Sequence, residues 1–75
     1  MLSDMRNKAG LSQPKLAEKS GVNVRMIQFY EQGAKDINGA KLKTLAKLAK
    51  ALDCSIAEIL TDESLIEEIK GLKLV

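Results

Sequence analysis

The chain has 75 residues, a formal net charge of +2, no His, no Trp, one Cys and one Pro. A chain of this length buries about 60% of its unfolded surface, which suffices for one small core and one domain. Without His and with Cys54 as the single Cys, the sequence lacks the partners for disulfides, zinc fingers and His-dependent catalysis, so we expect no metal, no cofactor and no enzyme activity.

Charge is divided unevenly along the chain. Residues 1–50 carry ten Lys and Arg against four Asp and Glu, whereas residues 51–75 carry two against six. A basic body with an acidic end suggests a polyanionic partner, although solvated helix surfaces give the same composition. No apolar run approaches the roughly 20 residues that a membrane-spanning helix needs, and no signal-peptide pattern is present, so we expect a cytoplasmic protein.

The composition is rich in helix-forming residues and shows no strand-like alternation, so it predicts an all-α domain. The first helix is predicted over residues 2–9. Leu2, Met5 and Ala9 share one apolar face there, and Gly10 ends the helix.

The next two helices are predicted from their caps. The second begins after Ser12, accepts Pro14 in its first turn because that amide has no partner within the helix, and ends near Gly21. The third begins at the N-cap Asn23 and ends at Gly33. Its inward side chains are expected to be Met26, Ile27 and Tyr30.

Three further helices are predicted in the C-terminal half. Residues 40–52 carry apolar side chains at spacings close to 3.6. They are Leu42, Leu45, Ala46, Leu48, Ala49 and Leu52. Ser55 with Glu58 forms a capping-box pattern that predicts a fifth helix, and Ser64 with Glu67 repeats the pattern for a short sixth.

The chain resembles the Cro and phage-repressor type of helix-turn-helix domain, the XRE-like family, in two segments: GLSQPKLAEKSGVNVRMIQFYEQG over residues 10–33 and TLAKLAKALDCSIAEIL over residues 44–60. The likeness lies in spacing, with Gly21 in the turn and Val22 and Ile27 packed behind it. It implies a five-helix lambda-repressor-like bundle with a short sixth helix.

The resemblance also divides the chain into two parts. It implies a DNA-binding domain over residues 1–62. Residues 63–75 would then form an apolar and acidic tail, ending in Leu74 and Val75, that dimerises or binds a partner protein.

In this family the helix over about residues 23–32 enters the major groove. The fork of the Arg25 guanidinium suits guanine or a phosphate, Gln28 suits adenine, and Val24 suits a thymine methyl group. Phe29 replaces a usually polar residue and either presses on thymine methyls or folds back on the bundle. The candidates for base contacts are therefore Asn23, Val24, Arg25, Gln28 and Phe29.

The resemblance assigns two further groups of residues. The phosphate-contacting candidates are Gln13, Lys35, Asn38 and Lys41. Arg6 and Glu31 occupy the positions of a structural ion pair that orients the reading helix.

The resemblance implies a sequence-specific double-stranded DNA-binding transcriptional regulator, a repressor that acts as a homodimer on a palindromic operator. Two alternatives stay open: an antitoxin-like regulator that also binds a partner protein, and a helical protein-interaction module without a DNA role. Besides Phe29, three features depart from the family pattern: Lys15 replaces an acidic capping residue, the interval from Gly33 to Leu45 is about one turn longer, and the first helix starts almost at Met1, which curtails the contacts of an N-terminal arm. Cys54 lies where the family tends to place a small apolar residue and is interpreted as a packing residue.

Overall fold

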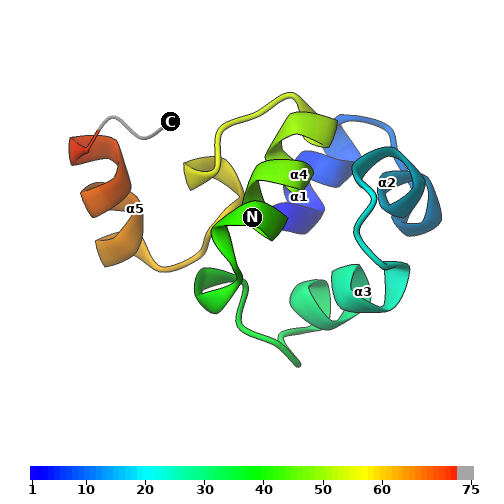
Figure 1. Cartoon of the computed structure of the whole chain (residues 1–75), viewed down its shortest axis with the longest axis horizontal. Helices are drawn as coiled ribbons and strands as arrows, with labels where there is room; N and C mark the ends of the chain where they lie inside the picture. The colour runs from blue at the N-terminus through cyan, green and yellow to red at the C-terminus, as the bar shows by residue number, and fades with distance from the viewer. Residues whose placement is uncertain (73–75) are drawn as a thin grey trace.

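The computed structural model describes residues 1–72, which form five α-helices and two single-turn 3-10 helices and contain no strand (Figure 1). In chain order these are α1 (Leu2–Lys8), α2 (Gln13–Ser20), α3 (Val24–Gln32), η1 (Ile37–Gly39), α4 (Leu42–Leu52), η2 (Ala57–Ile59) and α5 (Glu63–Gly71). The all-α, five-helix class is confirmed for this part of the chain. None of its helices is long and apolar enough to cross a membrane. Leu74 and Val75 lie outside the described residues.

Local capping sets the bounds of α2 and α3. The Ser12 hydroxyl accepts a hydrogen bond from the Lys15 amide at 3.2 Å, so the cap forms without the acidic residue of a capping box. The Asn23 side chain accepts one from the Arg25 amide at 2.7 Å. Gly33 ends α3 with a left-handed φ of +80°, a conformation in which glycine carries no Cβ penalty.

The core lies where these helices meet. Leu16, Ile27, Leu48 and Ile59 come from four different elements and are all fully buried. In Figure 1, α5 and α2 lie at opposite ends of the long axis, and α3 forms the lower edge of the molecule. This arrangement leaves one side of α3 uncovered by other helices.

The fourth helix begins at Leu42, two residues later than predicted. Between Gly33 and this helix, residues 37–39 form the single turn η1. Leu42 is 58% exposed and Ala46 is also exposed, so these two members of the 3.6-residue apolar spacing lie outside the buried face of α4. Ala51, which is not part of that spacing, is buried. The buried residues of α4 are therefore concentrated in its C-terminal half.

The last helices differ from the prediction. Both hydrogen bonds of the Ser55 and Glu58 capping box are present, at 2.8 and 3.3 Å, but they close only the single turn η2. The fifth α-helix is α5, which the sequence predicted as the sixth. Its N-cap is Asp62, whose carboxylate accepts from the Leu65 amide at 3.2 Å, and not Ser64.

Candidate nucleic-acid interface

A tight turn joins α2 to α3 and fixes their relative orientation. Gly21 ends α2 with a left-handed φ of +77°. Val22 is buried behind the turn, and its amide donates to the Ser20 hydroxyl at 3.1 Å. Leu16 and Ile27 fill the space between the inner faces of the two helices in the common core. The inner side of α3 is therefore occupied by core contacts, and its outer side is not.

An ion pair ties α3 to α1. Arg6 donates through Nε to Oε2 of Glu31 at 2.7 Å and through Nη2 to Oε1 at 3.0 Å. The third guanidinium nitrogen, Nη1, donates to the Leu11 carbonyl at 2.8 Å, and the Gln13 amide donates to Glu31 Oε1 at 3.0 Å. These contacts hold α1, the loop before α2, the start of α2 and the end of α3 together, so they fix the orientation of α3.

The ion pair is largely removed from water, since the Arg6 and Glu31 side chains are 15% and 8% exposed. Burial alone raises the pKa of Glu31. The hydrogen bonds from Arg6 and Gln13 and the Arg6 charge outweigh burial, so the pKa of Glu31 lies below its ordinary value. The hydrogen bond to Glu31 raises the pKa of Arg6 despite burial. Both groups are charged at neutral pH, so the contact is an ion pair between α1 and α3.

The outer face of α3 carries side chains that the core does not use. Residues 24, 25, 28, 29 and 32 fall on one side of the helix by its periodicity, and none of them belongs to the buried core. Arg25 and Gln32 are exposed, as is Asn23 at the N-cap. Val24, Gln28 and Phe29 are partly exposed. Phe29 is not among the side chains that pack against the core, so it does not fold back into it.

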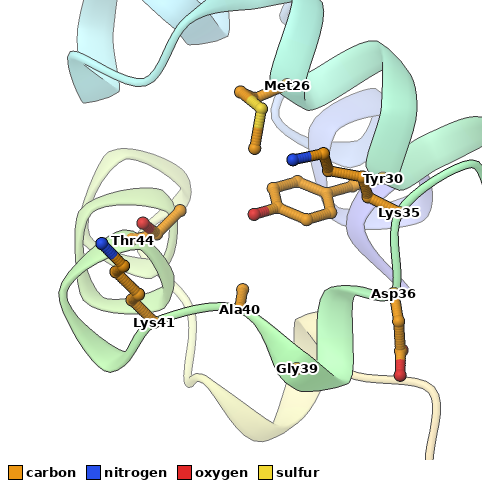
Figure 2. Close-up of a pocket in the computed structure, with 8 residues that line it drawn as sticks. All are labelled: Met26, Tyr30, Lys35, Asp36, Gly39, Ala40, Lys41 and Thr44. Carbon is orange, nitrogen blue, oxygen red and sulfur yellow. The ribbon is translucent and has the colours of Figure 1, made fainter.

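A hollow of about 660 Å³ lies between α3, η1 and the start of α4 (Figure 2). Lys35 lies on the α3 side and Lys41 at the start of α4, while the Tyr30 ring points into the space between them. The Asp36 carboxylate points away from the hollow in the same view. Two ammonium groups and a phenol thus lie in an open depression next to α3, together with apolar side chains such as Met26 and Ala40.

The sequence model of the helix-turn-helix family matches residues 2–59 of this chain. The chain belongs to the helix-turn-helix family. No curated protein and no solved structure matches it in the corresponding comparisons. Family membership identifies a DNA-binding regulator domain of the Cro and XRE-like type.

Within this helix-turn-helix domain, two phosphate candidates are engaged in internal contacts. Gln13 donates to Glu31, so its side chain supports the ion pair. The side-chain nitrogen of Asn38, Nδ2, donates to the Asp36 carboxylate and to the Thr61 hydroxyl at 2.8 Å each. Its side-chain oxygen, Oδ1, accepts from the backbone amides of Thr61 and Asp62 at 2.9 Å each. Both N–H groups of the Asn38 side chain are used inside the protein, so we withdraw Asn38 as a phosphate contact.

The hollow also contains residues that sequence reasoning assigned otherwise. Met26 and Tyr30 were expected only in the core, and Thr44 was not singled out, yet all three line the hollow with Lys35 and Lys41. Helical spacing predicts which side of α3 is apolar, but not that the Tyr30 hydroxyl points into the hollow (Figure 2).

Cys54 is partly buried and packs against the core. Burial and the charge of Glu58 raise the pKa of its thiol, which disfavours the reactive thiolate. Among residues 1–72, no three His, Cys, Asp or Glu side chains are grouped so as to hold a metal ion. The partly buried position of Cys54 against the core is typical of a packing residue.

Proposed function

We propose that this helix-turn-helix protein is a sequence-specific transcriptional regulator that binds duplex DNA with α3 in the major groove and represses by occluding its operator. The outer face of α3 is the observation that carries the proposal, because it leaves a contiguous set of polar and apolar side chains, Phe29 among them, outside the core. The proposal involves no catalytic step and no cofactor.

Base reading is assigned to the outer face of α3. Arg25, the exposed cation of that face, would bind guanine O6 and N7 through its fork, and Gln28 would bind adenine N6 and N7. Val24 and Phe29 supply apolar surface that suits thymine methyl groups. Asn23 and Gln32 lie at the two ends of this face.

Backbone binding is assigned to the hollow beside α3. A DNA phosphate placed there would meet the ammonium groups of Lys35 and Lys41, with the Tyr30 and Thr44 hydroxyls as further donors. Such contacts fix the position of a protein on the duplex without reading sequence. Gln13 contributes mainly by bracing Glu31.

The regulator is proposed to act as a homodimer on a palindromic site, with half-sites about 10 base pairs apart. Two small domains neutralising about six to eight phosphates together would give a log-log salt slope of about −5 to −7. The antitoxin-like alternative calls for a C-terminal helix free to clamp a partner. Ile69 of α5 is instead 9% exposed, and Asn38 holds the start of that segment, so this alternative has less support.

Selection of bound fragments from a random oligonucleotide pool tests the proposal, because it reports binding, symmetry and consensus together. We expect a palindromic consensus, and Arg25→Ala to relax one base position per half-site with a loss of about 1 to 3 kcal/mol. Lys8→Ala, at an exposed position of α1, is the matched control and should keep the consensus. An unchanged consensus for Arg25→Ala would remove that assignment, and no enrichment would remove the proposal.

Salt titration of the selected duplex tests the hollow separately. Lys35→Ala and Lys41→Ala should each weaken all duplexes about equally and make the salt slope shallower by about 1 per lost phosphate contact. Binding by the unaltered protein that does not respond to salt would contradict contact with the DNA backbone.

A further inference from the structure

The outward face of α4 is lined by lysines. Lys43, Lys47 and Lys50 follow the spacing i, i+4, i+7, so they share one side of the helix, opposite the buried Leu45 and Leu52. All three lysines are exposed. Toward the end of α2 this face becomes a groove of about 320 Å³. The groove is lined by Lys19, Ser20, Lys47, Lys50 and Ala51.

Nothing within the described chain neutralises these lysines. The ion pairs of residues 1–72 join the N-terminal amino group to Asp4 and Arg6 to Glu31, and neither involves this groove. Like charges at i, i+4 destabilise a helix, as Lys43 and Lys47 do here. Lys19 and Lys50 lie in the last turns of α2 and α4, where the helix dipole favours cations, but Lys47 has no such compensation. The lysine groove therefore suits an anionic partner.

The same chain carries an acidic face of matching character on α5. Asp62, Glu63, Glu67 and Glu68 are all exposed, and none of them is in an ion pair within residues 1–72. The apolar side of α5 is directed to the bundle through Ile69, so its outer side carries these carboxylates, with the exposed Lys70 as a cation in the last turn. Because α5 and α2 lie at opposite ends of the long axis, this acidic face and the lysine groove of the same copy lie far apart on the molecule (Figure 1).

We propose that the acidic face of α5 docks on the lysine groove of a second copy of this chain, and that the second copy returns the same contact. Charge complementarity between two unpaired surfaces of one chain is the argument for this occupant. A reciprocal pair satisfies both surfaces of both copies, as a two-fold dimer requires. Neither surface includes the outer face of α3 or the hollow. This contact would form the homodimer of the proposed function, and in that respect it rests on the proposed function. Self-association can nevertheless be measured without DNA.

Charge reversal tests the contact by sedimentation equilibrium without DNA. The unaltered protein should form dimers at low salt that dissociate as salt rises, because the contact is electrostatic and the Debye length shrinks to about 10 Å at 0.1 M. K47E/K50E and E63K/E67K should each weaken dimerisation at least about tenfold, since each places like charges in the contact. All four positions are exposed, and circular dichroism would verify the fold.

An equimolar mixture of the two variants gives the deciding measurement. Each variant then meets a complementary surface at both contacts, so the mixture should form a heterodimer although neither variant dimerises alone. K35E/K41E is the matched control, with the same change of charge in the hollow; it should dimerise normally and lose DNA binding. A mixture that stays monomeric, or an unaltered protein that is monomeric at low salt, would overturn the inference.

The lysine groove has one rival occupant, a nucleic-acid backbone. If K47E/K50E dimerises normally but loses DNA binding as fully as K35E/K41E, the groove belongs to DNA and the proposed contact is wrong. If only K35E/K41E loses DNA binding, the proposed dimer contact is unaffected. Failure of the contact is measured by sedimentation without DNA, and failure of the DNA-binding function is measured by DNA binding.

Discussion

At the scale of single residues, Glu31 has the most demanding position in the domain. It is nearly buried and accepts three hydrogen bonds, two from Arg6 and one from Gln13. A buried carboxylate is tolerated only when such partners replace water. The position of α3 relative to α1 thus depends on one charge and its donors.

We expect the stability contribution of Glu31 to depend on pH. Its folded pKa lies below the ordinary value of 4.5, so the contribution is complete above that value and is lost as pH falls through the folded pKa. Glu31→Gln should therefore destabilise the domain at pH 7, by about 2 to 3 kcal/mol, because Arg6 keeps its charge without a carboxylate. Urea unfolding at pH 7 and at about pH 3 should show the gap between the two proteins closing in acid. A gap of equal size at both pH values would contradict this role.

Asn38 joins two parts of the chain that are 23 residues apart in sequence. Asn38→Ala removes the bonds to Asp36, Thr61 and the Asp62 amide, and we expect a loss of about 1 to 3 kcal/mol in the free energy of unfolding. Amide hydrogen exchange should become faster in α5, which this side chain helps to place. Asn7→Ala, at an exposed position of α1, is the control and should change stability by less than about 0.5 kcal/mol. Equal effects of the two substitutions would show that Asn38 holds nothing.

At the scale of elements, the capping box of Ser55 and Glu58 shows how tertiary contacts override a local pattern. After η2, the amides of Thr61 and Asp62 donate to Asn38 Oδ1 in place of carbonyls one turn earlier. The Glu58 carbonyl, which a continuing helix would use, accepts instead from the N-terminal amino group at 2.9 Å. The box forms, but its helix stops after one turn because its next hydrogen-bonding groups have partners elsewhere.

Helix ends give a prediction about glycine. Gly21→Ala should destabilise by about 1 to 2 kcal/mol through backbone strain alone, since its φ is positive and no atom lies within 4 Å of an added Cβ. Gly71→Ala is the matched control, because Gly71 is the last residue of α5, has no positive φ and is also open to an added Cβ. Alanine there should leave stability unchanged or raise it by up to about 1 kcal/mol. Thermal unfolding of both variants would check the difference, and equal melting temperatures would refute it.

At the scale of the whole molecule, α5 belongs to the bundle although it lies at one end of it (Figure 1). Ile69 joins the core, while Leu65 and Ile66 pack against it from the same helix. The apolar surface that the sequence assigned to dimerisation is therefore partly used within the chain. Among the described residues of that segment, Leu72 remains largely in solvent, at 72% exposure.

This attachment predicts unequal effects of two similar truncations. Ile69→Ala should cost about 2 to 4 kcal/mol in the free energy of unfolding, because it opens a cavity in the core. Leu72→Ala removes a side chain of the same size from water and should change monomer stability by less than about 0.5 kcal/mol. Denaturant unfolding at low protein concentration separates the two. If Ile69→Ala is silent, α5 is not part of the cooperative unit.

The sequence by itself determined what local interactions decide. Ser12, Asn23 and the glycines at the ends of α2 and α3 act on backbone groups within a few residues, so these helices lie where the sequence predicts them. The family resemblance located Arg6 and Glu31, whose contact the structure displays. Contacts between distant segments required the tertiary structure: Asn38 turned inward to Thr61, the Ser55 helix reduced to one turn, and the Tyr30 ring pointing into the hollow between Lys35 and Lys41. The physical reason is that a hydrogen bond or a hollow between segments far apart in sequence depends on how whole helices pack, which spacing along the chain does not encode.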